Sequence, residues 1–194
     1  MTAAVVLAAG GSTRMGRPKP LLHYRGRSLL HRAVAAATNG GCAPVIVVLG
    51  AAAETLRPEL AGLSVEVTIN ERWKDGLAGS IRTGIEALQS RRPDVDAVLL
   101  MPCDLPHLSA RLVRELLGAA ADQGPCPIVA CEYAGTIGVP ALFHRRWFDE
   151  LCRLRGDRGA KSLLLAHPEA LVRVPWTEGA LDVDRPSDHE RPGA

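Results

Sequence analysis

The sequence predicts an α/β fold, namely a three-layer α/β/α sandwich around a mostly parallel central sheet. Short apolar runs rich in β-branched residues alternate with longer segments of helical periodicity along most of the 194-residue chain. Glycine- or proline-rich turns follow two of these runs, at residues 10–11 and 102–106. Such turns are expected at the carboxyl ends of parallel strands, where α/β sheets bind their ligands.

The first half of the chain is expected to contain three strands, each followed by a helix. The expected strands are residues 3–8, 44–50 and 64–70, and the expected helices are residues 29–39, 52–60 and 79–90. Ser28 is the predicted N-cap of the first helix, which the run Asn39-Gly40-Gly41 should end. In the third helix, Ile81, Ile85 and Leu88 share one face and are predicted to point inward.

The second half is expected to continue the same alternation. Residues 97–106 form the clearest transition from a strand to a loop, and Ser109 is the predicted N-cap of a helix that ends near residue 121. Further strands are expected at residues 126–133, 138–143 and 171–176, with helices at 145–154 and 159–166.

Composition excludes several classes of protein. Lys+Arg 23 against Asp+Glu 21 leaves a net charge of +2, which argues against a surface for nucleic acid. No apolar run has the length of a membrane-spanning helix, and Met1 leads into the first strand without a basic leader segment. The length of 194 residues suits one domain, and we expect it to span residues 1–194, with residues 186–194 as a frayed tail.

Cysteine usage indicates a cytoplasmic protein. The five cysteines are Cys42, Cys103, Cys126, Cys131 and Cys152. Their odd number and the absence of a Cys-x-x-Cys pair favour reduced thiols over a disulfide framework or a zinc site.

The segment VVLAAGGSTRMGRPKPLL, residues 5–22, has the chemistry of an anion site. Gly10 and Gly11 let backbone N–H groups approach a ligand closely, while Arg14 and Lys19 add two cations of different geometry. A polyphosphate suits this combination. The segment matches neither the P-loop nor the dinucleotide-binding fingerprint. The alternative is a tight turn between strand and helix with two solvated basic side chains.

Asp104 lies where the central strand should open into the same crevice. Pro102 and Pro106 restrict the backbone around it, and its carboxylate is a hard oxygen ligand of the kind that Mg²⁺ prefers. The alternative is a helix-capping role, for which Ser109 is better placed.

The pattern L-A-A-G-x-S-x-R-M-G-x-P-K, at residues 7–19, resembles the signature of the MobA-like NTP transferases. That family includes the molybdenum cofactor cytidylyltransferases and guanylyltransferases. Later blocks of the chain resemble the family in the same order; they are residues 70–85, 101–106, 138–143, 154–164 and 182–188. The resemblance implies a Rossmann-like nucleotidyltransferase fold.

The resemblance also implies a binding site for a nucleoside triphosphate. Arg14 and Lys19 would contact its phosphates, and the segment around Ser80 would lie beside the base. The implied nucleotide-binding residues are Leu7, Ala8, Ala9, Gly10, Gly11, Ser12, Arg14, Lys19, Asn70, Gly79 and Ser80. Two alternatives stay open here, because Ser80 also suits a helix N-cap and Trp73 suits either the core or a stacking contact.

A second carboxylate is expected at the metal. By resemblance, Asp104 and Asp184 bind Mg²⁺. Asp182 and Asp184 alternate along an expected strand and so point to opposite faces, which leaves open which of the two reaches the ion. The alternative for Asp184 is a solvated turn.

The acceptor side is defined less sharply. By resemblance, Gly138, Pro140, Asp157 and Lys161 would contact the acceptor. Val139 occupies the place where the cytidylyltransferases usually have histidine, so a phosphorylated acceptor other than molybdopterin stays open. Asp157 also suits a simple helix N-terminus.

The resemblance therefore implies an enzyme of the Mg²⁺-dependent nucleotidyltransferase class, with Arg14, Lys19 and Asp104 as its catalytic residues. It would transfer a nucleoside monophosphate from an NTP to a phosphorylated acceptor and release pyrophosphate. The run Ala8-Ala9-Gly10 favours CTP; a guanylyltransferase using GTP is the alternative, and a non-catalytic nucleotide or pterin carrier is a third. A molybdoenzyme or maturation factor is an implied protein partner.

Overall fold

The structure of the chain is a computed structural model that describes residues 1–11, 18–121 and 127–180. The expectations for Ser12, Arg14, Asp182 and Asp184, and for the tail at residues 186–194, fall outside these ranges.

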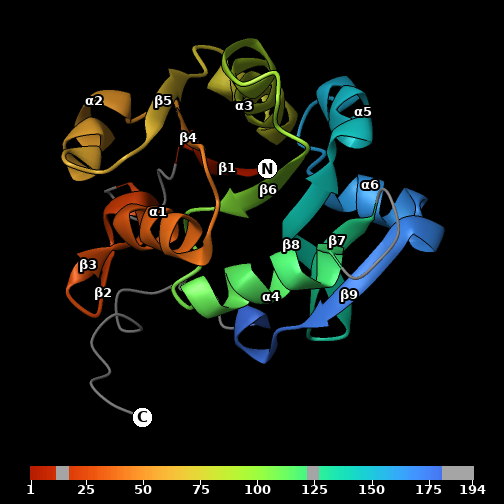
Figure 1. The fold of residues 1–194 in the computed structure, drawn as a ribbon. Coiled ribbons are helices and arrows are strands. Elements are labelled where there is room, and N and C mark those ends of the chain that lie inside the picture. The colour runs from red at the N-terminus through yellow and green to blue at the C-terminus, as the bar shows by residue number, and fades with distance from the viewer. Residues whose placement is uncertain (12–17, 122–126, 181–194) are drawn as a thin grey trace.

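A seven-stranded sheet forms the middle layer, with the strand order β5-β4-β1-β6-β8-β7-β9 (Figure 1). Its strands are β1 (Thr2–Ala8), β4 (Val45–Leu49), β5 (Glu66–Ile69), β6 (Ala97–Pro102), β7 (Ile128–Tyr133), β8 (Thr136–His144) and β9 (Leu171–Pro175). Of these strands, β8 runs antiparallel to both of its neighbours, β6 and β7, while the other pairings are parallel. The predicted mostly parallel sheet is confirmed.

Helices cover both faces of the sheet (Figure 1). On one face lie α1 (Leu29–Gly40), α2 (Ala53–Leu56) and α4 (Ala110–Ala121), which pack on a core cluster that includes Ala4, Val6 and Val47. On the other lie α3 (Leu77–Arg91), α5 (Phe148–Arg153) and α6 (Lys161–Ala166), which pack on a cluster that includes Val5 and Val48. Alternate side chains of β1 and β4 thus point to opposite faces of the sheet and pack in two separate cores, as expected of an α/β/α sandwich.

Short 3₁₀ segments link several of these elements. They are η2 (Lys19–Leu21), η3 (Arg57–Leu60), η4 (Trp73–Asp75), η5 (Arg145–Trp147), η6 (Pro168–Ala170) and η7 (Thr177–Ala180). Among the described residues, none of the helices combines the length and the apolar character needed to cross a membrane.

Local signals in the sequence account for three helix ends. The Ser28 hydroxyl accepts a hydrogen bond from His31 N at 3.2 Å, and Gly41 ends α1 in the left-handed region with φ 103°. Ser109 caps α4 by accepting from Leu112 N at 3.3 Å. All three roles were expected from the sequence.

Three features differ from the expectations. Helix α3 begins at Leu77 with Gly76 as its N-cap, so the N-cap interpretation of Ser80 is wrong, and Ser80 lies in the first turns of the helix. Strand β8 returns beside β7 through a two-residue turn, in which Ala134 and Gly135 have φ 49° and 71°. A small hairpin of β2 (His23–Tyr24) and β3 (Arg27–Ser28), each two residues long, precedes α1.

Candidate functional site

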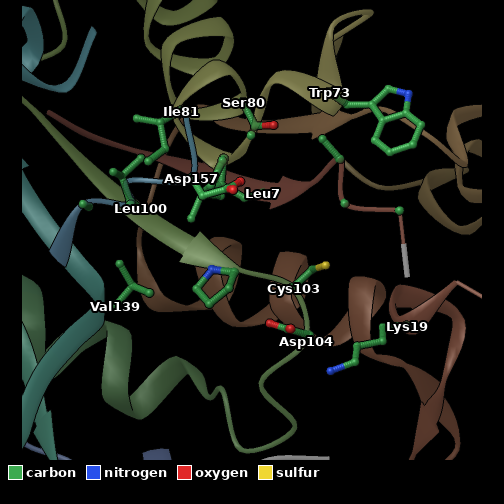
Figure 2. A pocket seen from close by; sticks show the side chains of 18 of the residues that line it. Leu7, Lys19, Trp73, Ser80, Ile81, Leu100, Cys103, Asp104, Val139 and Asp157 are labelled. Atoms are coloured by element: carbon green, nitrogen blue, oxygen red, sulfur yellow. The ribbon is translucent and has the colours of Figure 1, made fainter. Parts of the chain in front are cut away.

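A pocket of about 550 Å³ opens at the carboxyl ends of β1 and β6 (Figure 2). This volume lies within the range of roughly 300–1,000 Å³ that is typical of small-molecule sites. Its lining residues are Leu7, Ala9, Gly10, Gly11, Lys19, Pro20, Trp73, Lys74, Gly76, Leu77, Ser80, Ile81, Leu100, Pro102, Cys103, Asp104, Val139, Asp157, Gly159, Ala160 and Lys161. They come from the end of β1, the glycine turn at residues 9–11, η2, η4, the start of α3, β6 and its end, the middle of β8 and the segment that leads into α6.

The glycine turn reaches the pocket because small residues allow close packing behind it. An alanine at position 11 would place its Cβ 2.7 Å from Trp73 Cζ3, and one at position 50 would place it 2.6 Å from the Ala9 carbonyl oxygen. Ala51 N donates to that same carbonyl at 3.3 Å. By contrast, a Cβ at Gly10 would meet nothing within 4 Å. The turn therefore rests on Trp73 and the end of β4, and Gly10 borders open space.

Lys19 and Asp104 line this pocket together with the glycine turn. Lys19 begins η2, and Asp104 follows β6 after Cys103, whose N–H donates to Leu7 O at 3.2 Å. In Figure 2 both side chains lie at the lower edge of the pocket, across the view from Ser80 and Trp73. A cation and a carboxylate thus share one cavity with exposed glycine backbone, which suits a polyphosphate and a metal ion together.

Cys103 contributes packing to this pocket and no nucleophile. Its thiol is almost fully buried, and burial raises its pKa far above the usual range, with the negative charge of Asp104 adding to the effect. A thiol with such a pKa stays protonated at neutral pH, and the protonated form is neither a nucleophile nor a good metal ligand.

Ser80 lines the pocket and is hydrogen-bonded to Asn70, which lines a second hollow beside α3. Asn70, only 5% exposed, donates from Nδ2 to Ser80 Oγ at 3.1 Å and accepts at Oδ1 from Arg72 N, also at 3.1 Å. Asn70 and Gly79 line this second hollow, of about 290 Å³, and not the main pocket. Asn70 therefore affects the main pocket only by orienting Ser80. Because the Ser80 oxygen accepts the bond from Asn70, its hydroxyl proton can be donated to a ligand.

Part of the pocket carries two of the four residues predicted for the acceptor. Asp157 and Lys161 line it, and Lys161 Nζ donates to Thr136 Oγ1 at 2.7 Å. Its wall here is apolar, formed by side chains such as Leu77, Leu100 and Val139. Leu77 is 43% exposed, so much of its side chain is open to the cavity and the solvent.

Gly76 holds the segment with Asp157 against α3. Its φ of 103° favours glycine, and a Cβ there would lie within 2.8 Å of Asp157 N and closer still to the carbonyl group of Gly156. Ala78 N donates to Gly156 O at 3.0 Å. Asp157 therefore reaches the pocket because position 76 has no side chain.

The described residues contain no group of three or more His, Cys, Asp and Glu side chains that could hold a metal ion. Asp104 nevertheless fits Mg²⁺, because this ion usually takes one or two carboxylates and completes its octahedron with substrate phosphates and water. The pocket offers one such carboxylate beside the glycine turn and Lys19. A magnesium ion that arrives with a nucleotide suits this donor set.

The structure brings nine of the expected site residues into the pocket: Leu7, Ala9, Gly10, Gly11, Lys19, Ser80, Asp104, Asp157 and Lys161. Ala8 is buried beneath the turn, and Gly138 and Pro140 flank the lining residue Val139 without lining the pocket themselves. Lys74, Gly76 and Leu77 line it and were not expected. Position 76 could have been found, because a glycine directly before a helix marks a cap or a close approach.

Comparisons with known proteins identify a matching family. Residues 4–171 match the family described as the MobA-like NTP transferase domain. A molybdenum cofactor guanylyltransferase of Rhodopseudomonas palustris is 33% identical over 180 residues, which cover 90% of this chain and 83% of that protein. A nicotine blue oxidoreductase of Paenarthrobacter nicotinovorans is 36% identical over 114 residues, 58% of this chain, and the matched part spans only 54% of that relative's length.

Solved structures share the fold over nearly the whole chain. Rv0371c of Mycobacterium tuberculosis is 33% identical, with a TM-score of 0.81, over 96% of this chain and 94% of its own. A second structure of Rv0371c, described as a complex with manganese, is 31% identical, with a TM-score of 0.77, over 96% of this chain and 95% of its own.

Proposed function

Because the chain belongs to the MobA-like NTP transferase family, we propose that it transfers a nucleotidyl group from an NTP to a phosphorylated acceptor. One observation carries the proposal: the glycine turn, Lys19 and Asp104 line a single pocket. If the glycine turn and Asp104 lay on separate surfaces, they could not bind the phosphates and the metal ion of one nucleotide. The rest of the pocket supplies room for a base at Ser80 and for an acceptor at Val139 and Lys161.

The triphosphate is proposed to lie along the glycine turn. Backbone N–H groups at Gly10 and Gly11 and the ammonium group of Lys19 would neutralise its charge, with Arg14 assigned the same role from the sequence. Asp104, with Asp184 as the second expected carboxylate, would hold Mg²⁺. When bound, this ion supplies charge neutralisation on the phosphate oxygens.

The reaction needs no base from the protein. An acceptor phosphate is already ionised at neutral pH, and its oxygen forms a bond to the α-phosphorus. The bond from that phosphorus to the bridging oxygen breaks, and pyrophosphate leaves with the electron pair. No described histidine lines the pocket, in keeping with a reaction that depends on positioning and charge neutralisation.

CTP is the proposed nucleotide, from the sequence Ala8-Ala9-Gly10, and GTP is the alternative. The similarity to a molybdenum cofactor guanylyltransferase favours GTP. Ser80 can donate a hydrogen bond to an acceptor atom on either base, so its hydroxyl does not distinguish CTP from GTP. The preference for CTP therefore rests on the residues of the glycine turn.

Molybdopterin is the proposed acceptor class, with a molybdoenzyme or maturation factor as the partner. The apolar wall at Leu77, Leu100 and Val139 suits a flat, weakly polar body, and Lys74 and Lys161 suit its phosphate. Free thiols at Cys42, Cys103, Cys131 and Cys152 suit a reducing compartment, and we propose the cytoplasm.

Stabilisation by nucleotides tests this proposal. The free energy of unfolding is measured with CTP, GTP, ATP and UTP, each with and without Mg²⁺. At about 100 times its dissociation constant the true substrate should add about 2.7 kcal/mol. We expect this gain only with Mg²⁺ in the wild type and not in Asp104→Asn. Equal gains without Mg²⁺ would instead support the non-catalytic carrier.

A further inference from the structure

The loop that carries Asp104 from β6 to α4 has few ways to be held in place. Pro102 and Pro106 have no N–H groups to donate. Cys103 N donates to Leu7 O at 3.2 Å before Asp104, and Leu108 N bonds within the loop to Leu105 O at 3.4 Å. Beyond Asp104, Leu105 and Leu108 pack into the core, and further polar support comes from groups that donate to the loop's carbonyl oxygens.

Arg32 provides such support from α1. Its Nε and Nη2 donate to the carbonyl oxygen of Pro106, at 3.3 Å and 3.1 Å. Pro106 is buried and lies two residues after Asp104. Because a guanidinium group is planar, two bonds to one carbonyl fix the orientation of the loop as well as its distance from α1. Helix α1, which carries Arg32, is itself well ordered by its contacts, since Ser28 caps it and Leu30, Ala33 and Val34 are buried in the core.

The same arginine contacts the segment that leads on from Lys19. Its guanidinium carbon lies 5.0 Å from the ring centre of Tyr24 in the β2–β3 hairpin. The Tyr24 ring in turn meets the edge of the His107 ring, with 5.3 Å between centres. Leu29 N donates to Leu22 O at 2.9 Å, which fastens the start of α1 to the chain that follows η2. Arg32 thus contacts both the β2–β3 hairpin, which follows the segment with Lys19, and the loop with Asp104.

We propose that Arg32 is a positioning residue, which holds the Asp104 carboxylate in register with Lys19 so that both meet the same metal–nucleotide complex. The inference rests on the proposed function. Arg32 does not line the pocket, so it would act on Asp104 through Pro106. Groups that orient a metal ligand from behind typically change metal affinity or activity by about 10–100-fold when they are removed.

Arg32→Met tests the idea, because methionine keeps an apolar stem and loses both donors. Free and bound Mn²⁺ are counted by electron paramagnetic resonance, in one series with CTP and in a second with GTP. We expect the Mn²⁺ concentration for half-saturation to rise about 10–100-fold. Arg32→Lys, which restores one donor, should give an intermediate rise. The Mg²⁺ concentration for half-maximal turnover should rise in parallel, with kcat largely restored at saturating Mg²⁺.

Arg114→Met is the matched control. Arg114 also joins two elements by donating to a backbone carbonyl, Asn39 O at 2.9 Å, but it lies outside the pocket. This control should leave Mn²⁺ binding unchanged. A lowered stability in Arg32→Met and Arg32→Lys with wild-type Mn²⁺ half-saturation would overturn the positioning role. Failure of the wild type to bind Mn²⁺ with either nucleotide would instead overturn the proposed function itself.

Discussion

Replacing Gly10 by alanine separates the stability of the fold from the binding of nucleotide. The added Cβ would meet nothing within 4 Å, and the backbone at this position does not adopt the left-handed region. At such a site alanine stabilises the folded chain by about 0.4–1 kcal/mol, because it restricts the unfolded state. The fold should therefore tolerate Gly10→Ala. Gly10 lines the pocket, however, so the methyl group enters space that a triphosphate would fill.

The expected loss of affinity follows from this overlap. Forcing a methyl group into filled space costs about 1–3 kcal/mol, which corresponds to a rise in Kd of about 5–150-fold. Nucleotide at 100 times the wild-type Kd stabilises the wild type by about 2.7 kcal/mol. At the same concentration, the variant should gain only about 0.3–1.8 kcal/mol.

Denaturant unfolding with and without the favoured NTP and Mg²⁺ measures both effects. Gly118→Ala is the control, because position 118 in α4 also has nothing within 4 Å of a Cβ and lies outside the pocket. It should keep the full gain from nucleotide. A full gain in Gly10→Ala as well would refute the claim that phosphates lie against the glycine turn.

Three further predictions concern residues in the site and beside it. Gly76→Ala should lose about 1–3 kcal/mol more stability than Gly41→Ala in denaturant unfolding, since both have φ 103° but only position 76 would meet another segment; equal losses would contradict this. Lys19→Met should lower kcat for pyrophosphate release about 10²–10³-fold, and a wild-type rate would remove Lys19 from the mechanism. Burial, followed by the charge of Arg25, lowers the pKa of His107, so the unfolded chain takes up the proton first as the pH falls below 6.5. The free energy of unfolding should therefore drop less from pH 7 to pH 5 in His107→Gln than in the wild type, and an equal drop would count against that pKa shift.

Local sequence signals predicted the elements that place the site. The apolar run before the glycines became β1, the run before Asp104 became β6, and the hydroxyls of Ser28 and Ser109 cap the helices expected of them. These features depend on neighbours along the chain, and that is where patterns of residues carry information.

Contacts between distant segments were not predictable in the same way. The reversed direction of β8 depends on the turn at Ala134 and Gly135, where alanine is not a usual residue for positive φ. The bonds from Arg32 to Pro106, 74 residues away, leave no periodic trace in the sequence.

One local signal was misinterpreted. Ser80 resembled an N-cap because Gly76, three residues before the expected helix start at residue 79, was not recognised as the true N-cap.

The central claim is that the glycine turn and Asp104 bind one nucleotide–metal complex. A crystal structure with Mn²⁺ and a non-hydrolysable CTP or GTP analogue tests it most directly, since anomalous scattering locates the manganese. The account predicts one ion bound by the Asp104 carboxylate and by phosphate oxygens that lie along Gly10, Gly11 and Lys19. Manganese bound away from Asp104, or a triphosphate outside this pocket, would contradict it.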